Sequence, residues 1–207
     1  MLPWVFLLAI FSTSAQKKKD TKNASSADEI SLDAFKMRNI GPAFLSGRIA
    51  DIVFDPQDDN VWYVGVGSGG VWKTENAGTT WTPIFDDQES YSIGCLAIDS
   101  QNPAHIWVGS GENVGGRHVA YGDGVYFSAD GGKKWRNVGL KDSQHISKII
   151  IHPENSNVVW VAAQGPLWNK GGDRGVYKTT DGGAHWKQVL GDTAWMLSLI
   201  HISEPTR

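Results

Sequence analysis

The sequence contains a single cysteine, Cys95, among its 207 residues. An intrachain disulfide is therefore excluded, which suits an exported bacterial protein better than a small extracellular module held together by disulfides. Cys95 lies in an apolar run at residues 93–98, so we expect it to be a small buried core residue rather than a reactive thiol.

An excess of charge of one sign is also missing. The 19 Lys and Arg residues are nearly balanced by 22 Asp and Glu residues, and the formal net charge is -3. Without a basic excess there is no electrostatic reason to expect a nucleic-acid partner, and we predict none.

Long apolar runs are limited to residues 1–15, which end in small residues ahead of three lysines. This run has the length of a secretory signal peptide and is short for a membrane span. We predict a signal peptide at residues 1–15, a polar linker at 16–34, and no membrane span after signal removal. The expected location is secreted, periplasmic or on the cell surface of a bacterium.

Helical periodicity is lacking in the repeated units described below, since none holds a ten-residue stretch of 3.6-residue apolar periodicity free of Gly or Pro. Glycine and tryptophan are instead abundant, with 24 and 10 residues. Many glycines indicate many turns, and tryptophan at a fixed place in a repeat indicates packing between repeats.

One short pattern occurs three times, beginning at Thr74, Ser128 and Thr179: a hydroxyl residue, then Asp or Asn, then Gly and Trp. A tight hairpin needs glycine for positive φ and an Asx or hydroxyl side chain that bonds nearby amides. We therefore interpret the pattern as scaffold rather than as a catalytic site. Its defining residues are Asn76, Gly78, Trp81, Asp130, Gly132, Trp135, Asp181, Gly183 and Trp186.

Each copy ends a longer unit that contains an apolar run, a turn, a second β-prone run, a Gly-rich loop and a Gly-Val-aromatic run. The repeated tryptophans are 54 and 51 residues apart, close to the period of four-stranded β-propeller blades, about 40 to 50 residues. We predict an all-β fold, an incomplete β-propeller of about three four-stranded antiparallel blades. The blades are expected at residues 47–88, 89–143 and 144–196.

The two ends of the chain do not fit the unit. Residues 35–41 match residues 133–139 position for position, so we expect a lone outer strand and a connection at 35–46. Residues 197–207 resemble a translated sequencing adapter, and we predict a non-native tail on an inactive fragment of a longer protein. Three blades do not close a ring, which agrees with that prediction.

The three copies resemble Asp-boxes, the repeats shared by sialidases, sortilin-type propellers and several secreted glycoside hydrolases. The resemblance covers roughly residues 35–195, with Asn76 in place of the family's Asp. It implies a sortilin-like domain that recognises an extracellular carbohydrate or peptide, or alternatively a propeller-type glycoside hydrolase. Arginines are few for the three-arginine cluster of a sialidase, which argues against that activity.

The loops between the second and third strands of each unit are expected to share one face with the connections between blades. A glycosidase needs two carboxyl groups a few ångströms apart, so the acids of the two longer loops are candidates. The catalytic candidates are Glu112, Asp123 and Asp173. The ligand-binding candidates are Arg117, His118, Tyr121, Trp168, Lys170 and Arg174. Asp123 and Asp173 are alternatively turn or salt-bridge residues, since both lie close before a glycine.

Metal ligands are not suggested by the histidines, since His145, His152 and His185 lack zinc-ligand spacing. No Asp-rich calcium loop occurs, and we predict neither a metal nor a cofactor. Asp51, Cys95 and Lys148 share one column of the first strands. Asp51 and Lys148 are candidates for the lining of a central channel, with a buried ion pair as the alternative.

Overall fold

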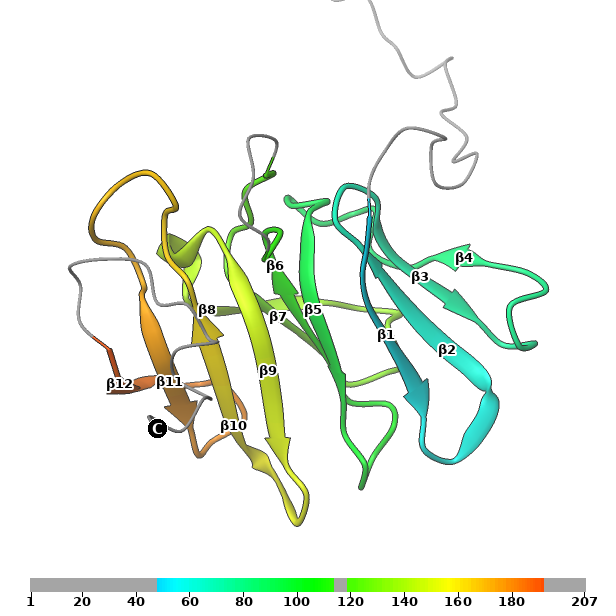
Figure 1. The fold of residues 1–207 in the computed structure, drawn as a ribbon. Coiled ribbons are helices and arrows are strands. Elements are labelled where there is room, and N and C mark those ends of the chain that lie inside the picture. Colours follow the sequence, from blue (N-terminus) through cyan, green and yellow to red (C-terminus); the bar gives the residue numbers. More distant parts are fainter. Residues whose placement is uncertain (1–47, 114–118, 192–207) are drawn as a thin grey trace, which may run out of the picture. The chain divides into compact units, whose positions relative to one another are not determined.

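The computed structural model describes residues 48–113 and 119–191, all within the unit Asn39–Arg207. These residues form three four-stranded antiparallel sheets, and in each sheet consecutive strands are neighbours (Figure 1). The predicted fold class is confirmed: the protein is all-β, an incomplete β-propeller. The predicted signal peptide, linker, lone outer strand and tail, together with Arg117 and His118, lie outside the described residues.

The strands of the three sheets, here called blades 1, 2 and 3, follow in chain order. Blade 1 contains β1 Ile49–Asp55, β2 Asp58–Val66, β3 Gly70–Thr74 and β4 Thr82–Pro83. Blade 2 contains β5 Ile93–Ile98, β6 Ile106–Ser110, β7 Val125–Ser128 and β8 Arg136–Gly139. Blade 3 contains β9 Ile146–His152, β10 Asn155–Ala163, β11 Gly175–Thr179 and β12 Lys187–Leu190. A short 3-10 helix, η1 Lys141–Ser143, precedes blade 3.

The turn between the third and fourth strands is built alike in all three blades. In blade 2 the Ser128 hydroxyl donates to Asp130 Oδ1 at 2.9 Å and accepts the amide of Gly132 at 2.9 Å. Asp130 Oδ1 also accepts the amide of Lys134 at 2.8 Å. The same bonds recur around Thr74 and Thr179, and each turn has a glycine at positive φ. Short-range side-chain bonds therefore fix the hairpin in each blade.

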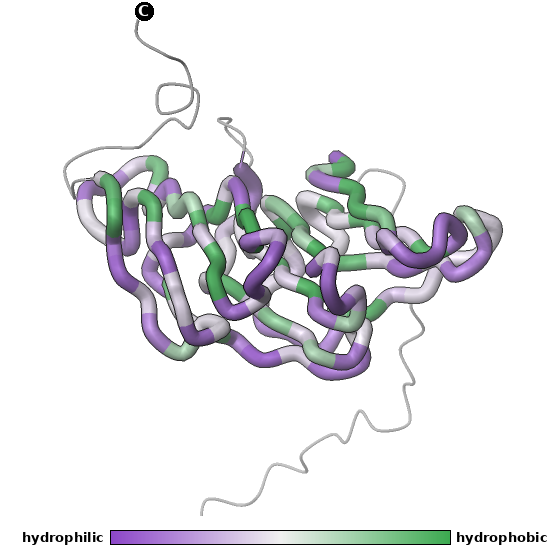
Figure 2. The backbone as a smooth tube through the Cα atoms, turned by 90° about the horizontal axis from the view of Figure 1, so that it is seen from below, coloured by the Kyte–Doolittle hydropathy of each residue, from purple (hydrophilic) through white to green (hydrophobic). Residues whose placement is uncertain are grey.

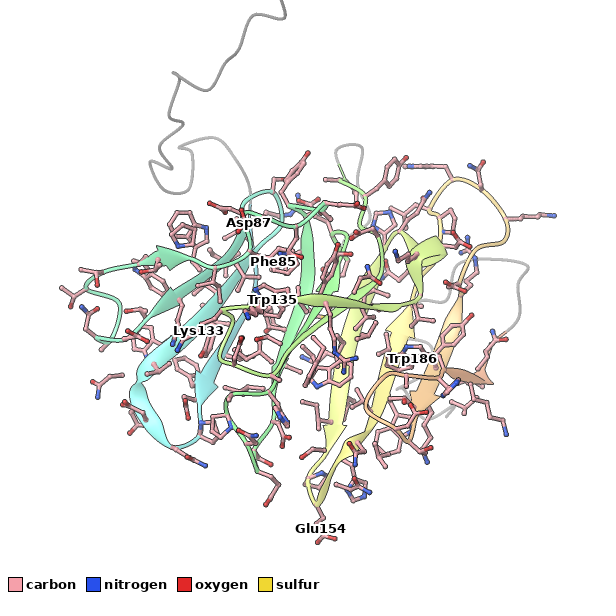
Figure 3. All side chains as sticks on the ribbon, turned by 180° about the vertical axis from the view of Figure 1, so that it is seen from behind. Phe85, Asp87, Lys133, Trp135, Glu154 and Trp186 are labelled. Carbon is pink, nitrogen blue, oxygen red and sulfur yellow. The ribbon has the colours of Figure 1, made fainter. Side chains whose placement is uncertain are left out.

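The core lies between the blades. The indole of Trp135 donates to the carbonyl of Ile84 at 2.6 Å, and that of Trp186 donates to the carbonyl of Val138 at 2.7 Å. Phe85 packs edge-on against Trp135, with ring centroids 5.2 Å apart (Figure 3). Figure 2 shows the hydrophobic residues gathered along the strands and the hydrophilic ones at many of the turns. Trp135 and Trp186 thus close the boundaries of their blades with the preceding blades.

The innermost strands β1, β5 and β9 contact one another in that order. Asp51 Oδ2 accepts the amide of Leu96 at 3.0 Å and lies 3.7 Å from Nζ of Lys148. Cys95, on β5, is fully buried, and burial raises the pKa of its thiol to about 12. The column predicted from the sequence therefore contains an ion pair that links blade 1 to blade 3.

Candidate functional site

The loops from the second to the third strand and the connections between blades lie along one edge of the sheets, at the top of Figure 1. Backbone hydrogen bonds join each of these loops to a neighbouring connection between blades. Gly70 donates to Tyr91 at 2.8 Å, and Gly111 donates to Ser92 at 2.7 Å. We call this edge the loop face, and its backbone is held by the blades on both sides.

Glu112 is the most buried of the predicted catalytic acids, with 4% of its side chain exposed. Its Oε2 lies 2.5 Å from Nη2 of Arg48, and its Oε1 accepts the hydroxyl of Ser68 at 3.3 Å. Gly67 leaves room for the carboxylate, because a Cβ at that position would lie 2.5 Å from Oε1. Both carboxylate oxygens are therefore engaged across the boundary between blades 1 and 2.

Asp123 lies near the end of the second loop, just before β7. Its Oδ1 accepts the hydroxyl of Ser110 at 3.0 Å, and its Oδ2 accepts the hydroxyl of Tyr126. Burial raises the pKa of Tyr126, so the phenol remains a donor at neutral pH. The Asp123 carboxylate therefore ties the end of the loop to β6 and β7.

Asp173 lies in the third loop and is half-buried. Its Oδ2 accepts the amide of Asp142 at 3.2 Å. Burial raises the pKa of Asp173, and the negative charge of Asp142 acts in the same direction. In the part of the chain that the structure describes, no hydrogen bond joins any two of the three predicted acids.

Arg174 is 1% exposed and lies inside the third loop. Its guanidinium donates to four backbone carbonyls of that loop, those of Gln164, Pro166, Asn169 and Gly171. The fixed fork of an arginine matches such a ring of acceptors, so Arg174 holds the loop in one shape. Trp168 stands on this loop with 69% of its surface exposed, and Lys170 is exposed beside it.

Three aromatic rings are exposed on the loop face: Tyr91 at 62%, Tyr121 at 57% and Trp168 at 69%. Tyr91 was not among the residues predicted from the sequence. The available signal was its place in the connection between blades 1 and 2, which was expected on this face. The serine before it, Ser90, donates its hydroxyl to the carbonyl of Tyr121 at 3.3 Å, which links the segments that carry the two tyrosines.

Tyr121 packs edge-on against His145, with ring centroids 5.6 Å apart. His145 is fully buried, and its Nδ1 is 2.8 Å from the carbonyl of Glu112. Burial lowers the pKa of His145, so the imidazole is neutral at pH 7. The Tyr121 ring therefore packs against an uncharged ring. Its Nε2 has no partner among the described residues.

Within residues 48–113 and 119–191, no group of three or more His, Cys, Asp or Glu side chains is arranged to hold a metal ion. No helix in the same residues is long and apolar enough to cross a bilayer.

These features define three blades of a β-propeller with exposed aromatic rings and acids on the loop face. No family model matches the chain. It is 24% identical over 175 residues to a xyloglucanase from Hypocrea jecorina, which covers 78% of the chain and 20% of the relative. It is 31% identical over 119 residues to an oligoxyloglucan-reducing end-specific xyloglucanase from Emericella nidulans, covering 56% of the chain and 14% of the relative. The chain thus spans a fifth or less of the length of these curated relatives.

Solved structures show the same fold. An ancestral GH74 enzyme matches 76% of the chain and 20% of its own length, with a TM-score of 0.59 and 24% identity. The GH74 xyloglucanase from Xanthomonas campestris matches 73% of the chain and 21% of its own length, with a TM-score of 0.51 and 19% identity. An auxiliary nutrient binding protein from Bacteroides thetaiotaomicron matches 73% and 32%, with a TM-score of 0.50 and 13% identity.

Proposed function

We propose that the chain is part of an extracellular β-propeller that binds a polysaccharide on its loop face through Tyr91, Tyr121 and Trp168. The observation that carries the proposal is the exposure of these three rings, each more than half accessible, on one edge of the sheets. The sequence relationship to xyloglucanases, enzymes named for a polysaccharide, supports a carbohydrate over a peptide. We further propose that the repeats are Asp-boxes of the sortilin-like class.

Aromatic rings on a rigid support are suited to this ligand. A sugar ring presents an apolar face of C–H groups, which gains from burial against the flat face of a tyrosine or tryptophan. Backbone hydrogen bonds hold the chain at Tyr91 and next to Tyr121, and Arg174 holds the backbone around Trp168, so little freedom is lost on binding. In this proposal Arg174 positions Trp168 and does not contact the ligand, while Lys170 is placed to reach polar groups of the sugar.

Binding is favoured over hydrolysis because two of the predicted acids are already engaged. Glu112 is paired with Arg48, and both oxygens of Asp123 accept hydroxyl hydrogen bonds. A glycosidase needs one protonated and one ionised carboxyl group that face the scissile bond. Such a pair would have to recruit Glu112 or Asp123 from its present partners.

The test is a titration of the protein with soluble xyloglucan and its oligosaccharides, followed by calorimetry. Tyr91→Ala, Tyr121→Ala and Trp168→Ala are each expected to weaken binding about 5- to 30-fold, since a stacked ring contributes about 1–2 kcal/mol. Phe54→Ala removes an exposed ring away from the loop face and is the matched control. Binding that survives all three loop-face substitutions would refute the proposal.

A second candidate function, polysaccharide hydrolysis, is favoured by one observation, the raised pKa of Asp173. A carboxyl group that stays protonated nearer neutral pH is suited to act as a general acid. Release of reducing sugar from xyloglucan should then be abolished by Asp173→Asn and unaffected by Asp59→Asn, which lies on the opposite edge. A parent protein that binds without releasing sugar would exclude hydrolysis and leave the binding proposal standing.

A further inference from the structure

The two blade boundaries in the structure are built from the same parts. In each, the tryptophan of one blade donates its indole N–H to a backbone carbonyl of the preceding blade, that of Ile84 or Val138. The aliphatic side chain of the accepting residue faces the glycine of the turn. A Cβ placed on Gly132 would lie 2.5 Å from Cδ1 of Ile84, and one on Gly183 would lie 3.3 Å from Cβ of Val138.

Blade 1 has the two residues that the later blade contributes to such a boundary, the tryptophan that donates the hydrogen bond and the glycine of the turn. Trp81 occupies the place of Trp135 and Trp186, and Gly78 occupies the place of the two turn glycines. The Trp81 side chain is 38% exposed, and its indole N–H has no hydrogen-bond acceptor within the described ranges. Trp81 therefore has the position of the two boundary tryptophans, but within the described residues it does not form the contacts that they form.

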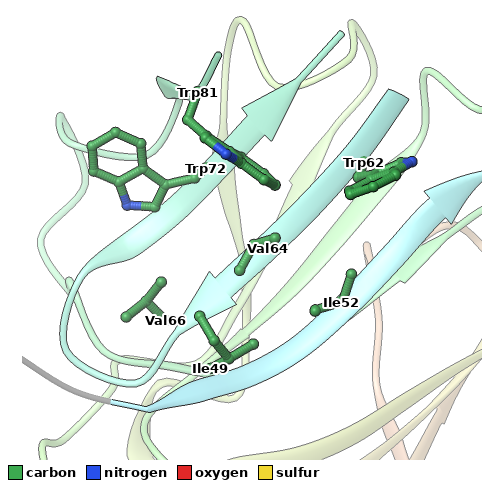
Figure 4. A pocket seen from close by; sticks show the side chains of 7 residues that line it. All are labelled: Ile49, Ile52, Trp62, Val64, Val66, Trp72 and Trp81. Carbon is green, nitrogen blue, oxygen red and sulfur yellow. The ribbon is translucent and has the colours of Figure 1, made fainter. Parts of the chain in front are cut away.

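The face of blade 1 beside Trp81 is an open apolar groove of about 310 Å³ (Figure 4). Only hydrophobic side chains line it: Ile49, Ile52, Trp62, Val64, Val66, Trp72 and Trp81. Ile49, the first residue of β1, is 58% exposed, whereas the first residues of β5 and β9, Ile93 and Ile146, are fully buried. Ile49, Ile52 and Trp81 are thus left exposed along the groove, although Val64, Val66 and Trp72 are buried in a small cluster of their own.

The segment Asn39–Gly41 of this chain has the sequence expected of the segment whose carbonyl accepts the tryptophan N–H. Asn39-Ile40-Gly41 repeats the pattern of Asn137–Gly139, whose central residue, Val138, accepts the Trp186 bond. Ile40 precedes the first residue of β1 by nine residues, and Ile84 precedes the first residue of β5 by nine. The connecting chain is therefore long enough to place Ile40 beside blade 1 as Ile84 is placed beside blade 2.

We propose that Asn39–Gly41 docks on the groove of blade 1, with the carbonyl of Ile40 accepting the indole N–H of Trp81 and the Ile40 side chain packing against Gly78. The competing occupant is blade 3 of a second copy, in which Val189 follows Trp186 by three residues and is 47% exposed. The tethered segment is favoured, because a short connection gives an effective concentration in the millimolar range.

The first test is a disulfide formed under mild oxidation in the double variant Ile40→Cys with Gly78→Cys. The matched control is Val138→Cys with Gly183→Cys, because that boundary is in the structure and both glycines have nearly the same positive φ. The Cβ separation at the control pair, 3.3 Å, is close to the range of disulfides, about 3.5–4.5 Å. The native Cys95 is fully buried and does not compete.

An intramolecular 40–78 disulfide, identified by mass spectrometry at a yield like that of the control, is the expected result. Its absence while the control pair forms would overturn the proposal. A disulfide between chains in the Val189→Cys with Gly78→Cys variant, seen as a covalent dimer, would instead assign the groove to a second copy.

The second test does not depend on cysteines. Trp81→Phe removes the indole donor and keeps an aromatic ring, as Trp135→Phe does at the boundary of blades 1 and 2. Docking predicts that both substitutions lower the midpoint of urea unfolding by similar amounts. A Trp81→Phe variant with the midpoint of the parent, when Trp135→Phe is destabilised, would show that Trp81 has no acceptor.

Discussion

Glu112 and Arg48 form an ion pair with a 2.5 Å N···O distance across the boundary of blades 1 and 2, although 64 residues separate them in the sequence. The carboxylate is almost fully buried, whereas 55% of the Arg48 side chain is exposed. The pair therefore closes the end of the boundary at the loop face. An acid that the sequence suggested for catalysis is at the same time a link between blades.

Replacement of Glu112 by Gln should lower the free energy of unfolding by about 1–2 kcal/mol. The neutral amide cannot form the ion pair with the Arg48 guanidinium. Urea unfolding followed by circular dichroism measures the change. Glu89→Gln, an exposed acid before blade 2, is the matched control, and equal stability of the two variants would contradict a linking role for Glu112.

Replacement of Arg174 by Lys should weaken polysaccharide binding about as much as Trp168→Ala does. Lysine offers one compact ammonium in place of the fork that reaches four carbonyls, so the third loop would lose the shape that presents Trp168. Calorimetric titration with xyloglucan provides the measurement. Arg136→Lys makes the same chemical change at an exposed site and should bind like the parent.

Acid should destabilise the protein partly through Asp181. The amide of His185, and after it the Thr179 hydroxyl and the His185 side chain, lower the pKa of Asp181 in the folded state. The stabilisation is therefore present above the unfolded pKa, about 3.9, and is lost as the pH falls from there through the lower folded pKa.

Substitution Asp181→Asn should flatten the dependence of the unfolding midpoint on pH below about 4. Asparagine is compatible with the turn, because Asn76 makes the corresponding bond to the amide of Thr80 at 2.8 Å. The reciprocal change, Asn76→Asp, should steepen the same dependence. Parallel pH profiles for the two variants and the parent would count against this linkage.

The thiol of Cys95 should react with aromatic disulfide reagents only when the protein unfolds. It is fully buried, and its raised pKa leaves almost no thiolate at pH 8. Labelling should therefore begin at the same urea concentration as the loss of the circular dichroism signal. Rapid labelling of the native protein would show that the inner strands open locally.

Parts of the fold could be predicted from the sequence, because they depend on residues that are close together in the chain. The hydrogen bonds of each turn span at most four residues, as from Ser128 to Gly132, so their pattern is visible as a motif. The number of strands per blade followed from the spacing of the repeats. The fourth strand of blade 1 has only two residues, Thr82–Pro83, and this length could not be read from the repeat.

The candidate site was harder to predict from the sequence, because its residues acquire their roles from partners that are distant in the chain. The sequence placed Glu112, Asp123 and Asp173 in loops but could not show that Arg48, Tyr126 and Asp142 meet them. Tyr91 was overlooked for a related reason: its exposure depends on how the connection between blades 1 and 2 packs.

The sequence by itself determined the repeating turn, the length of each unit and the all-β class, since local hydrogen bonding and apolar periodicity act over a few residues. Only the tertiary structure decided which acids are engaged, which rings remain exposed and where an indole lacks its acceptor. These depend on contacts between blades some fifty residues apart in the chain, and such contacts leave no local pattern.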